Sequence, residues 1–273
     1  MSTESPRDLI ERPTLSEAWL VALRTLAARG QDPGSPLTVS FTNFDKNGLP
    51  IELRAIRECL DRELAKHRKM TVEISAAMIF PFGSLQLLEM RLMRIVSITE
   101  LAEYYRQRVY PRLRARNRRA NGKGTYFLRM INFGADPKDD NSAGENQLAK
   151  LLTIWQSNDR IVQSALQVAI RDPKQDLTRN PRPFFPCLQQ ASFAYGPQNR
   201  ISVTGYYPTQ YIFDRAYGNY LGLAHLGWFV ARAMKKRLAR VNCICAHPLI
   251  GGIGVTRSAL RRAFVNVDRH DSS

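Results

Sequence analysis

The residue best suited to chemistry is Cys187, which follows a proline in the stretch Phe-Phe-Pro-Cys-Leu at 184–188. A cysteine acts as a nucleophile only as the thiolate, and nearby cations such as Arg179 and Arg182 could lower its pKa. Four cysteines in 273 residues are too few for a disulfide scaffold, so we expect a free thiol in a reducing compartment. The alternative is that Cys187 is an inert buried residue.

Several motifs, taken in order, resemble the thymidylate synthase family. They are Gly-Thr-Tyr at 124–126, Phe-Gly at 133–134, Asn-Gln-Leu at 146–148, Asp-Pro at 172–173, Pro-Cys at 186–187, and Asn219 at the start of a long apolar helix. Their order and spacing match the family over roughly residues 95–255. The resemblance implies an α/β fold of the α+β type, with a mixed sheet packed on a long buried helix.

The resemblance also implies a reaction. Cys187 would add to C6 of a pyrimidine, and Asn219 would read O4 or N4 of the base with its amide. C5 would then attack a one-carbon electrophile, usually supplied by the reduced folate 5,10-methylenetetrahydrofolate. Glu89 is the best match to the family's catalytic glutamate, against an ordinary carboxylate on a helix surface. The alternative for Asn219 is a cap or turn before the helix.

The residues that hold the nucleotide in the family are largely replaced. Where the family has Arg-Ser-x-Asp, this chain reads Tyr207-Pro208-Thr209-Gln210, so the phosphate-binding arginine is missing and Gln210 offers an amide in place of a carboxylate. The arginines that follow the family's Asp-Pro motif are also missing, and Arg179 and Arg182 are the nearby substitutes. Tyr207 and Gln210 are therefore candidates for substrate binding. We do not expect an ordinary thymidylate synthase.

The segment Cys243-Ile244-Cys245-Ala246-His247 carries three further polar groups at alternate positions. In a strand they would point to one face, as metal ligands could. The sequence shows no fourth ligand, and the spacing differs from that of the usual zinc hairpins, so we predict a buried strand and no metal site. His247 is the only counterpart of the histidine that binds the ribose in the family.

The chain is strongly basic, with 40 Lys and Arg against 24 Asp and Glu, a net charge of +16 and a pI near 10.1. Such an excess favours a polyanionic partner, through attraction and counterion release. The densest cluster, and our candidate polyanion site, contains Arg112, Arg114, Arg116, Arg118 and Arg119. A second cluster lies between 232 and 240. The alternatives to nucleic acid are a solvated basic face or an acidic protein partner.

Composition and hydrophobic periodicity predict one mixed α/β domain. It comprises a disordered tail at 1–13, a region at 14–94 that matches the family poorly, and a thymidylate-synthase-like core at 95–265. We expect helices at 16–28, 52–67, 84–93, 98–109, 144–157, 159–170 and 215–238, and strands at 37–41, 70–80, 189–194 and 200–206. The chain has no apolar run of about 18 residues and no signal peptide, which indicates a cytoplasmic protein without a membrane span.

Two functions follow from these observations. In the first, the chain is a divergent transferase that modifies C5 of a pyrimidine nucleotide, or of a pyrimidine within a nucleic acid, by methyl or hydroxymethyl transfer. In the second, it has lost its chemistry and serves as a nucleotide- or nucleic-acid-binding component of a larger assembly. By analogy with the back-to-back sheets of the family's dimer, we expect a homodimer.

Overall fold

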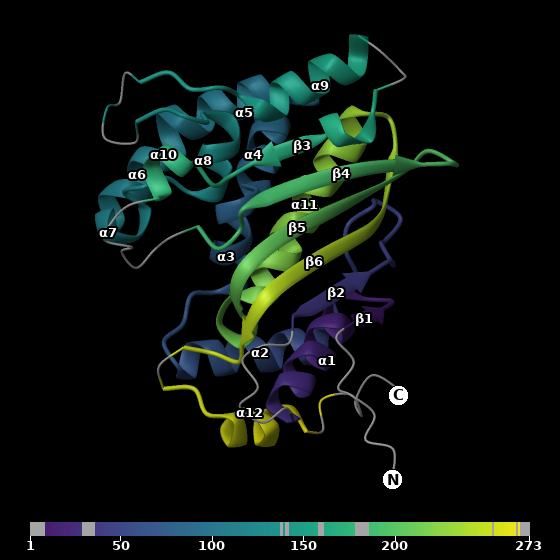
Figure 1. The fold of residues 1–273 in the computed structure, drawn as a ribbon, viewed down its shortest axis with the longest axis vertical. Coiled ribbons are helices and arrows are strands. Elements are labelled where there is room, and N and C mark those ends of the chain that lie inside the picture. The colour runs from purple at the N-terminus through teal and green to yellow at the C-terminus, as the bar shows by residue number, and fades with distance from the viewer. Residues whose placement is uncertain are drawn as a thin grey trace.

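The computed structural model describes residues 9–28, 36–136, 139, 142–157, 161–177, 186–252, 254–265 and 267. Among these residues, six strands form one mixed sheet in the order β1-β2-β6-β5-β4-β3 (Figure 1). Parallel pairing joins β1 to β2 and β5 to β6, and the other neighbours are antiparallel. The strands are β1 (Leu9–Arg12), β2 (Leu37–Phe41), β3 (Gln167–Ala169), β4 (Gln190–Gly196), β5 (Arg200–Tyr211) and β6 (Arg237–Leu249).

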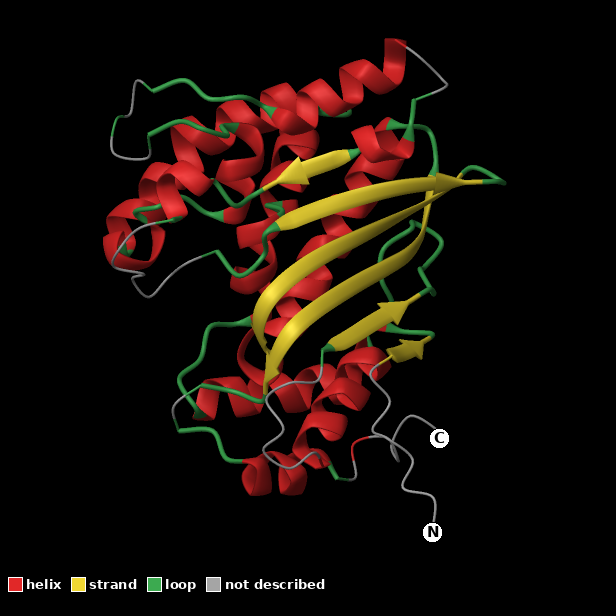
Figure 2. Cartoon of the chain, viewed as in Figure 1, coloured by secondary structure: helices red, strands yellow, loops and turns green. Residues whose placement is uncertain are grey.

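Helices cover the rear face of the sheet in the view of Figure 2, and others extend beyond its β3 edge. The first six are α1 (Leu15–Ala28), α2 (Arg54–Lys66), α3 (Val72–Ile79), α4 (Phe82–Leu92), α5 (Ile98–Tyr104) and the π-helix η1 (Tyr105–Val109). They are followed by α6 (Tyr110–Arg116), α7 (Arg118–Asn121), α8 (Tyr126–Ile131), α9 (Gln147–Ser157), η2 (Gln163–Ala165), α10 (Pro173–Asp176), the π-helix η3 (Ile212–Ala216), α11 (Tyr217–Ala233) and α12 (Arg257–Phe264). The mixed α/β class with a mixed sheet is thus confirmed.

Three predicted elements differ from the structure. Residues 72–79 form helix α3 instead of a strand, because Thr71 caps the helix by accepting a hydrogen bond from the Ile74 amide. The predicted helix at 159–170 is wrong for its described part, which forms η2 and β3. Residues 9–12 form β1 instead of belonging to a disordered tail, and residues 1–8 lie outside the described residues.

The N-terminal elements are bonded directly to the segment that precedes α11. The indole of Trp19, fully buried on α1, donates to the Ile212 carbonyl over 2.8 Å, and Ser16 shares a 2.7 Å hydrogen bond with the Tyr217 hydroxyl. The Leu53 amide also donates to the Ser16 hydroxyl. These bonds hold η3 and the start of α11 against α1, although about 200 residues separate them in the sequence.

Helix α11 packs so closely on α3 that two positions require glycine. A Cβ atom on Gly218 would lie 2.5 Å from the Cβ of Ser75, and one on Gly222 would lie 2.5 Å from the Ala76 carbonyl oxygen. Such separations are shorter than van der Waals contact allows, so the helices would have to move apart. The close approach places the buried side of α3 against the first turns of α11.

Among the described residues, none of the individual helices has both the length and the apolar character needed to cross a membrane. Helices α3 and α4 meet those criteria only when taken together, and they meet at an angle of 75°.

We predict that Gly222→Ala destabilises the fold by about 1–3 kcal/mol, because overpacking at a helix contact forces backbone shifts. Gly83→Ala is the matched control, since a Cβ there meets no atom within 4 Å. The free energy of unfolding from urea titration tests this difference. Equal stability of the two variants would contradict the proposed close contact.

A candidate site around Cys187

Cys187 lies in a short segment that enters β4 and is tied down on two sides. The Gln189 amide donates to the Tyr206 carbonyl, and the Gln189 carbonyl accepts from the amides of Ile170 and Arg171. The Gln189 side chain donates to the Pro186 carbonyl over 2.7 Å, and Leu188 is fully buried. The segment is therefore fixed against β5, and it holds the half-buried thiol in one place.

Two groups flank the thiol, and the sequence interpretation gave a role to neither. The Tyr126 hydroxyl, at the start of α8, donates a hydrogen bond to the Cys187 sulfur and accepts from the amides of Cys187 and Leu188. The exposed guanidinium of Arg215, on η3, is close enough to stabilise the thiolate electrostatically. A phenol and a cation thus stand beside the sulfur.

Burial nevertheless dominates the ionisation of this thiol. Desolvation raises the pKa of Cys187 above its usual range, and the Arg215 charge and the Tyr126 hydrogen bond offset that rise only in part. At neutral pH the group is therefore mostly the neutral thiol. This result differs from our expectation of a lowered pKa, because desolvation outweighs the nearby cation. Arg179 and Arg182 lie outside the described residues.

Beside the thiol, β5 contributes two buried polar side chains that have no hydrogen-bond partner among the described residues. Tyr207 is fully buried, close enough to Cys187 and Tyr126 to interact electrostatically, and its hydroxyl is unpaired. Gln210 is 1% exposed, and neither its amide nitrogen nor its amide oxygen is paired. An unpaired buried amide costs about 1–3 kcal/mol. Native proteins pair nearly all such groups, so this amide is a candidate ligand contact.

Asn219 lies in the first turn of α11 and is 4% exposed, so its amide faces the protein interior. Its neighbour Gly218 faces α3, where the absence of a side chain allows the two helices to approach. On the facing helix α3, the buried hydroxyl of Ser75 also has no partner among the described residues. Polar groups of α3, β5 and α11 are thus buried in this part of the protein.

The structure does not bring Glu89 to the thiol. Its carboxylate accepts hydrogen bonds from Arg232 at 2.7 and 3.2 Å and from the Val96 amide at 3.1 Å. Burial opposes ionisation of Glu89, but these bonds outweigh it and lower the pKa of the carboxyl. Arg232 lies 13 residues beyond Asn219 on α11, roughly 20 Å along the helix axis. Glu89 is therefore half of an ion pair at the far end of α11, a correction to its expected catalytic position.

His247 lies on β6 beside Thr209 of β5 and is partly buried. Cys243 and Cys245 are buried in the same strand, as predicted, and burial raises the pKa of Cys245 to about 12. All four cysteines are thiols. No group of three or more His, Cys, Asp or Glu side chains in the described part of the chain could hold a metal ion.

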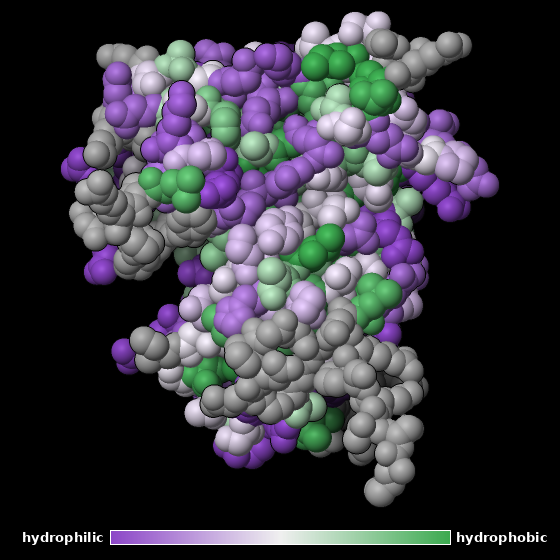
Figure 3. Space-filling view, in the orientation of Figure 1, coloured by the Kyte–Doolittle hydropathy of each residue, from purple (hydrophilic) through white to green (hydrophobic). Residues whose placement is uncertain are grey.

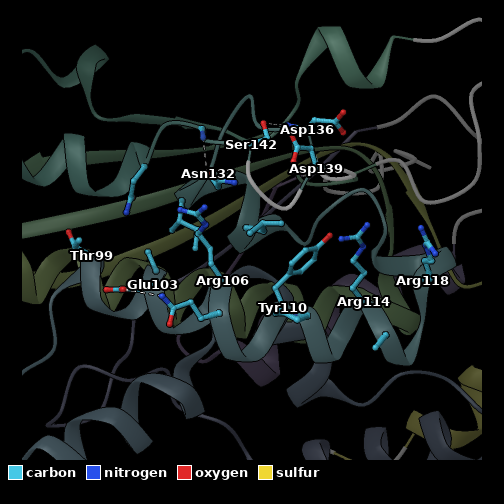
Figure 4. A pocket seen from close by; sticks show the side chains of 18 residues that line it. Thr99, Glu103, Arg106, Tyr110, Arg114, Arg118, Asn132, Asp136, Asp139 and Ser142 are labelled. Atoms are coloured by element: carbon cyan, nitrogen blue, oxygen red, sulfur yellow. Dashed lines mark hydrogen bonds between the residues drawn. The ribbon is translucent and has the colours of Figure 1, made fainter.

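The arginine cluster at 112–119 is divided between different surfaces. Arg114 and Arg118 line a hollow of about 1100 Å³ together with Arg106 and Tyr110, whereas Arg112 and Arg116 are exposed outside it. The opposite wall carries Asn132, Asp136, Asp139 and Ser142 (Figure 4). Arginines and aspartates therefore face each other across this hollow, so its charge is mixed.

The sequence interpretation missed Tyr126 and Arg215. Tyr126 is the tyrosine of the Gly-Thr-Tyr motif at 124–126, and its place in that motif could have indicated that it belongs to the site. Arg215 has no comparable signal, because only the path of η3 directs it toward the thiol.

No protein-family model matches this chain, and no curated protein matches it.

We predict that Arg215→Gln slows alkylation of Cys187 by about threefold at pH 8, because loss of the cation raises the thiol pKa and reduces the thiolate fraction. Iodoacetamide labelling with peptide-level mass spectrometry distinguishes Cys187 from the other cysteines. Arg91→Gln, which removes an exposed cation from α4, should leave the rate unchanged. If Arg215→Gln leaves the alkylation rate unchanged, Arg215 does not influence the ionisation of Cys187.

Proposed function

We propose that this chain is a divergent protein of the thymidylate synthase fold that adds Cys187 to C6 of a pyrimidine and transfers a methyl or hydroxymethyl group to C5. The observation that carries the proposal is the clustering of a thiol, a phenol and an exposed guanidinium, with the unpaired buried amide of Gln210 three residues along β5 from Tyr207, which interacts with the thiol. The thiol supplies the nucleophile for addition to a ring, and a cation and a phenol can assist its ionisation and proton transfer. An amide can pair with the ring edge.

The electrons and protons can be followed through this reaction. The Cys187 thiolate forms a bond to C6, and the electron pair of the C5–C6 double bond moves toward C5 and O4. C5 then attacks the one-carbon electrophile and loses its proton to a base. Elimination breaks the bond between sulfur and C6 and restores the thiolate. To complete the transfer, the bond between the one-carbon group and its carrier would break; addition of water would give a hydroxymethyl group, and addition of a hydride from the reduced carrier, which would thereby be oxidised, would give a methyl group. Arg215 stabilises the thiolate before addition and after elimination, and Tyr126 is placed to move a proton next to the sulfur.

Gln210 and Asn219 are the proposed contacts to the pyrimidine edge. Each amide carries one acceptor and two donor hydrogens, so either can pair with O4 or N4 of a base. Arg215 is the proposed cation for a substrate phosphate, since Pro208 occupies the place of the family's arginine and Arg215 has no carboxylate partner among the described residues.

A reduced folate is the donor that the resemblance implies, and it would supply the one-carbon group. We assign none of the described residues to it. A reducing compartment such as the cytoplasm suits a reactive thiol.

A second candidate function has specific support. The raised pKa of Cys187 and the ion pair of Glu89 with Arg232 both describe a site without an activated nucleophile or a nearby carboxylate base. In this alternative the same site binds a nucleotide or nucleic acid without changing it, as one component of a larger assembly.

Exchange of the C5 proton for deuterium, followed by NMR on uridine and cytidine nucleotides and short oligonucleotides, separates the two functions. We predict exchange that Cys187→Ser abolishes, that Tyr126→Phe slows by roughly ten- to a hundredfold, and that Glu89→Gln leaves in place. The rate should rise with pH up to the raised pKa of Cys187, since only the thiolate adds. Binding without exchange at any pH would support the second function.

We also propose that the open face of the sheet joins two copies of the chain. In the middle of that face, away from the exposed Arg200 and Arg237 at the start of β5 and β6, the outward residues are uncharged: Ser192, Ala194, Ser202, Thr204, Tyr206, Asn242 and Ile244. Tyr206 and Ile244 lie side by side there and are 43% and 37% exposed. Pale and green residues predominate over the middle of β5 and β6 in Figure 3. Depletion of charge marks the core of protein interfaces.

Ile244→Lys should convert a dimer into a monomer, because it buries an unpaired charge at this contact. Sedimentation velocity measures the change directly. Ile154→Lys on α9 is the matched control, since Ile154 is 41% exposed on a helix away from the face. A wild-type monomer, or a dimer that Ile244→Lys leaves intact, would rule out this interface.

A further inference from the structure

A second hollow, of about 1000 Å³, lies at the end of the sheet where β5 and β6 begin. Its walls are the turn between β4 and β5, the start of β6, the last turns of α11 and the loop at 42–48. The Arg237 amide donates to the Asn199 carbonyl, which joins the β4–β5 turn to β6. Arg200 lines this hollow, and Tyr207, which interacts with Cys187, lies seven residues further along β5. At the rise of a strand, the hollow is therefore roughly 20 Å from the thiol.

The walls of this hollow are strongly positive. They carry one carboxylate, Asp45, which accepts hydrogen bonds from the backbone amides of Asn47 and Leu49 over 2.8 and 2.9 Å and so holds its own loop. Against this one carboxylate, the walls carry six cationic side chains: Lys46, Arg200, Arg232, Lys236, Arg237 and Arg240. This hollow therefore has an excess of positive charge, whereas the hollow beside Arg114 carries both charges.

Two of the six cations are neutralised by the protein itself. Arg232 pairs with Glu89 at 2.7 Å, and Arg240 pairs with Glu11 at 2.8 Å. The other four have no carboxylate partner in the part of the chain that the structure describes. An anion in the hollow would therefore meet cations that no described carboxylate already neutralises.

Arg200 and Arg237 make the strongest case for a bound anion. They are register partners at the first positions of β5 and β6, and both are exposed. Like charges on directly neighbouring strands are unfavourable, and no described carboxylate lies between these two to relieve the repulsion. A phosphate group held by both guanidinium groups would relieve it.

The negative end of a helix dipole attracts cations, and α11 ends beside the hollow. That effect accounts for Lys236, which follows the helix. It does not account for Arg200 on β5 or Lys46 in the 42–48 loop, which come from other parts of the sequence. Three separate segments thus bring cations to one place.

Three aromatic side chains at or near the hollow lie against its cations. Lys236 lies over the rings of Trp155 and Tyr195, and Arg232 lies 4.5 Å from the centre of the Trp228 ring. Such contacts fix the position of a positive group. These rings therefore fix cations in the positions where they would meet phosphates.

We propose that this hollow binds the phosphodiester backbone of a nucleic acid, with Arg200, Arg237, Lys46 and Lys236 as the phosphate contacts and no dependence on base sequence. Planar guanidinium groups match phosphate geometry in a bidentate manner. The contact is independent of chemistry at Cys187. A strand could occupy the hollow whether or not one of its bases is modified.

The test is the fluorescence anisotropy of a labelled poly-dT oligonucleotide, and of a labelled duplex of equal length, titrated with the full chain at several salt concentrations. Arg200→Gln/Arg237→Gln should weaken binding about tenfold and reduce the salt dependence, because two phosphate contacts are lost. The same variant should be at least as stable as the wild type, since the repulsion between the two arginines is gone. Lys46→Gln is a further variant that leaves the sheet untouched.

The matched control is Arg62→Gln/Arg68→Gln, which removes the same charge from exposed positions on α2 and just after its end. Equal weakening by both pairs would show attraction to net charge alone and would overturn the assignment of this hollow. Unchanged binding in the Arg200 and Arg237 pair would overturn it as well. So would binding of poly-glutamate as tight as that of the oligonucleotides, which would indicate an acidic protein partner. The ratio of single-strand to duplex affinity identifies the form of nucleic acid that the hollow accepts.

Discussion

The close packing of α11 between α3 and the sheet is the constraint on which the rest of the structure depends. On one side, Gly218 and Gly222 allow the backbone of α3 to approach; on the other, a Cβ on Gly227 would lie 2.7 Å from the Val203 side chain of β5. A helix held on both sides has no freedom to shift along its axis. The amide of Asn219 and the cation of Arg215 are therefore positioned by core packing.

The same helix separates two kinds of chemistry. Its first turn and the preceding η3 lie near a thiol with a phenol beside it, where buried amides and hydroxyls are available for a neutral ring. Its last turn ends beside a hollow of cations, where Glu89 and Glu11 pair with two arginines and leave the remainder for a ligand. A molecule that carries both a base and a run of phosphates offers a partner to each end.

Many of the helices and strands could be predicted, because the local pattern of apolar and polar residues is enough to indicate them. Strand β2 has the predicted bounds, the β4–β5 hairpin forms across the predicted turn, and α9 lies within the predicted helix. Helix α3 was misassigned because residues 70–75 alternate between apolar and polar side chains, which is the pattern of a strand. Its buried positions Val72, Ser75, Ala76 and Ile79 follow a helical period, and that pattern appears only once α11 covers them.

The site was less predictable, since it depends on how distant segments meet. The thiol and the asparagine were found from their motifs. Glu89 was predicted to be catalytic from a short local match in the sequence. The packing of α4 against the last turns of α11 instead makes Arg232 its ion-pair partner. Conversely, the densest run of arginines in the sequence is spread over several faces of its helices. The pair Arg200 and Arg237 becomes a cluster only because β5 and β6 are parallel neighbours.

The order of strands in the sheet has a consequence for how the chain folds during synthesis. Strand β6, the last of the described strands in the sequence, is the one that joins β1 and β2 to the other strands. Until it leaves the ribosome, β2 lacks its antiparallel partner, and β5 has an unpaired edge. The β5–α11–β6 unit is local in sequence and can form by itself, whereas the N-terminal strands must wait for it. The sheet is therefore completed late, when β6 pairs with both β2 and β5. Until then, the exposed edges of β2 and β5 must be protected in the nascent chain.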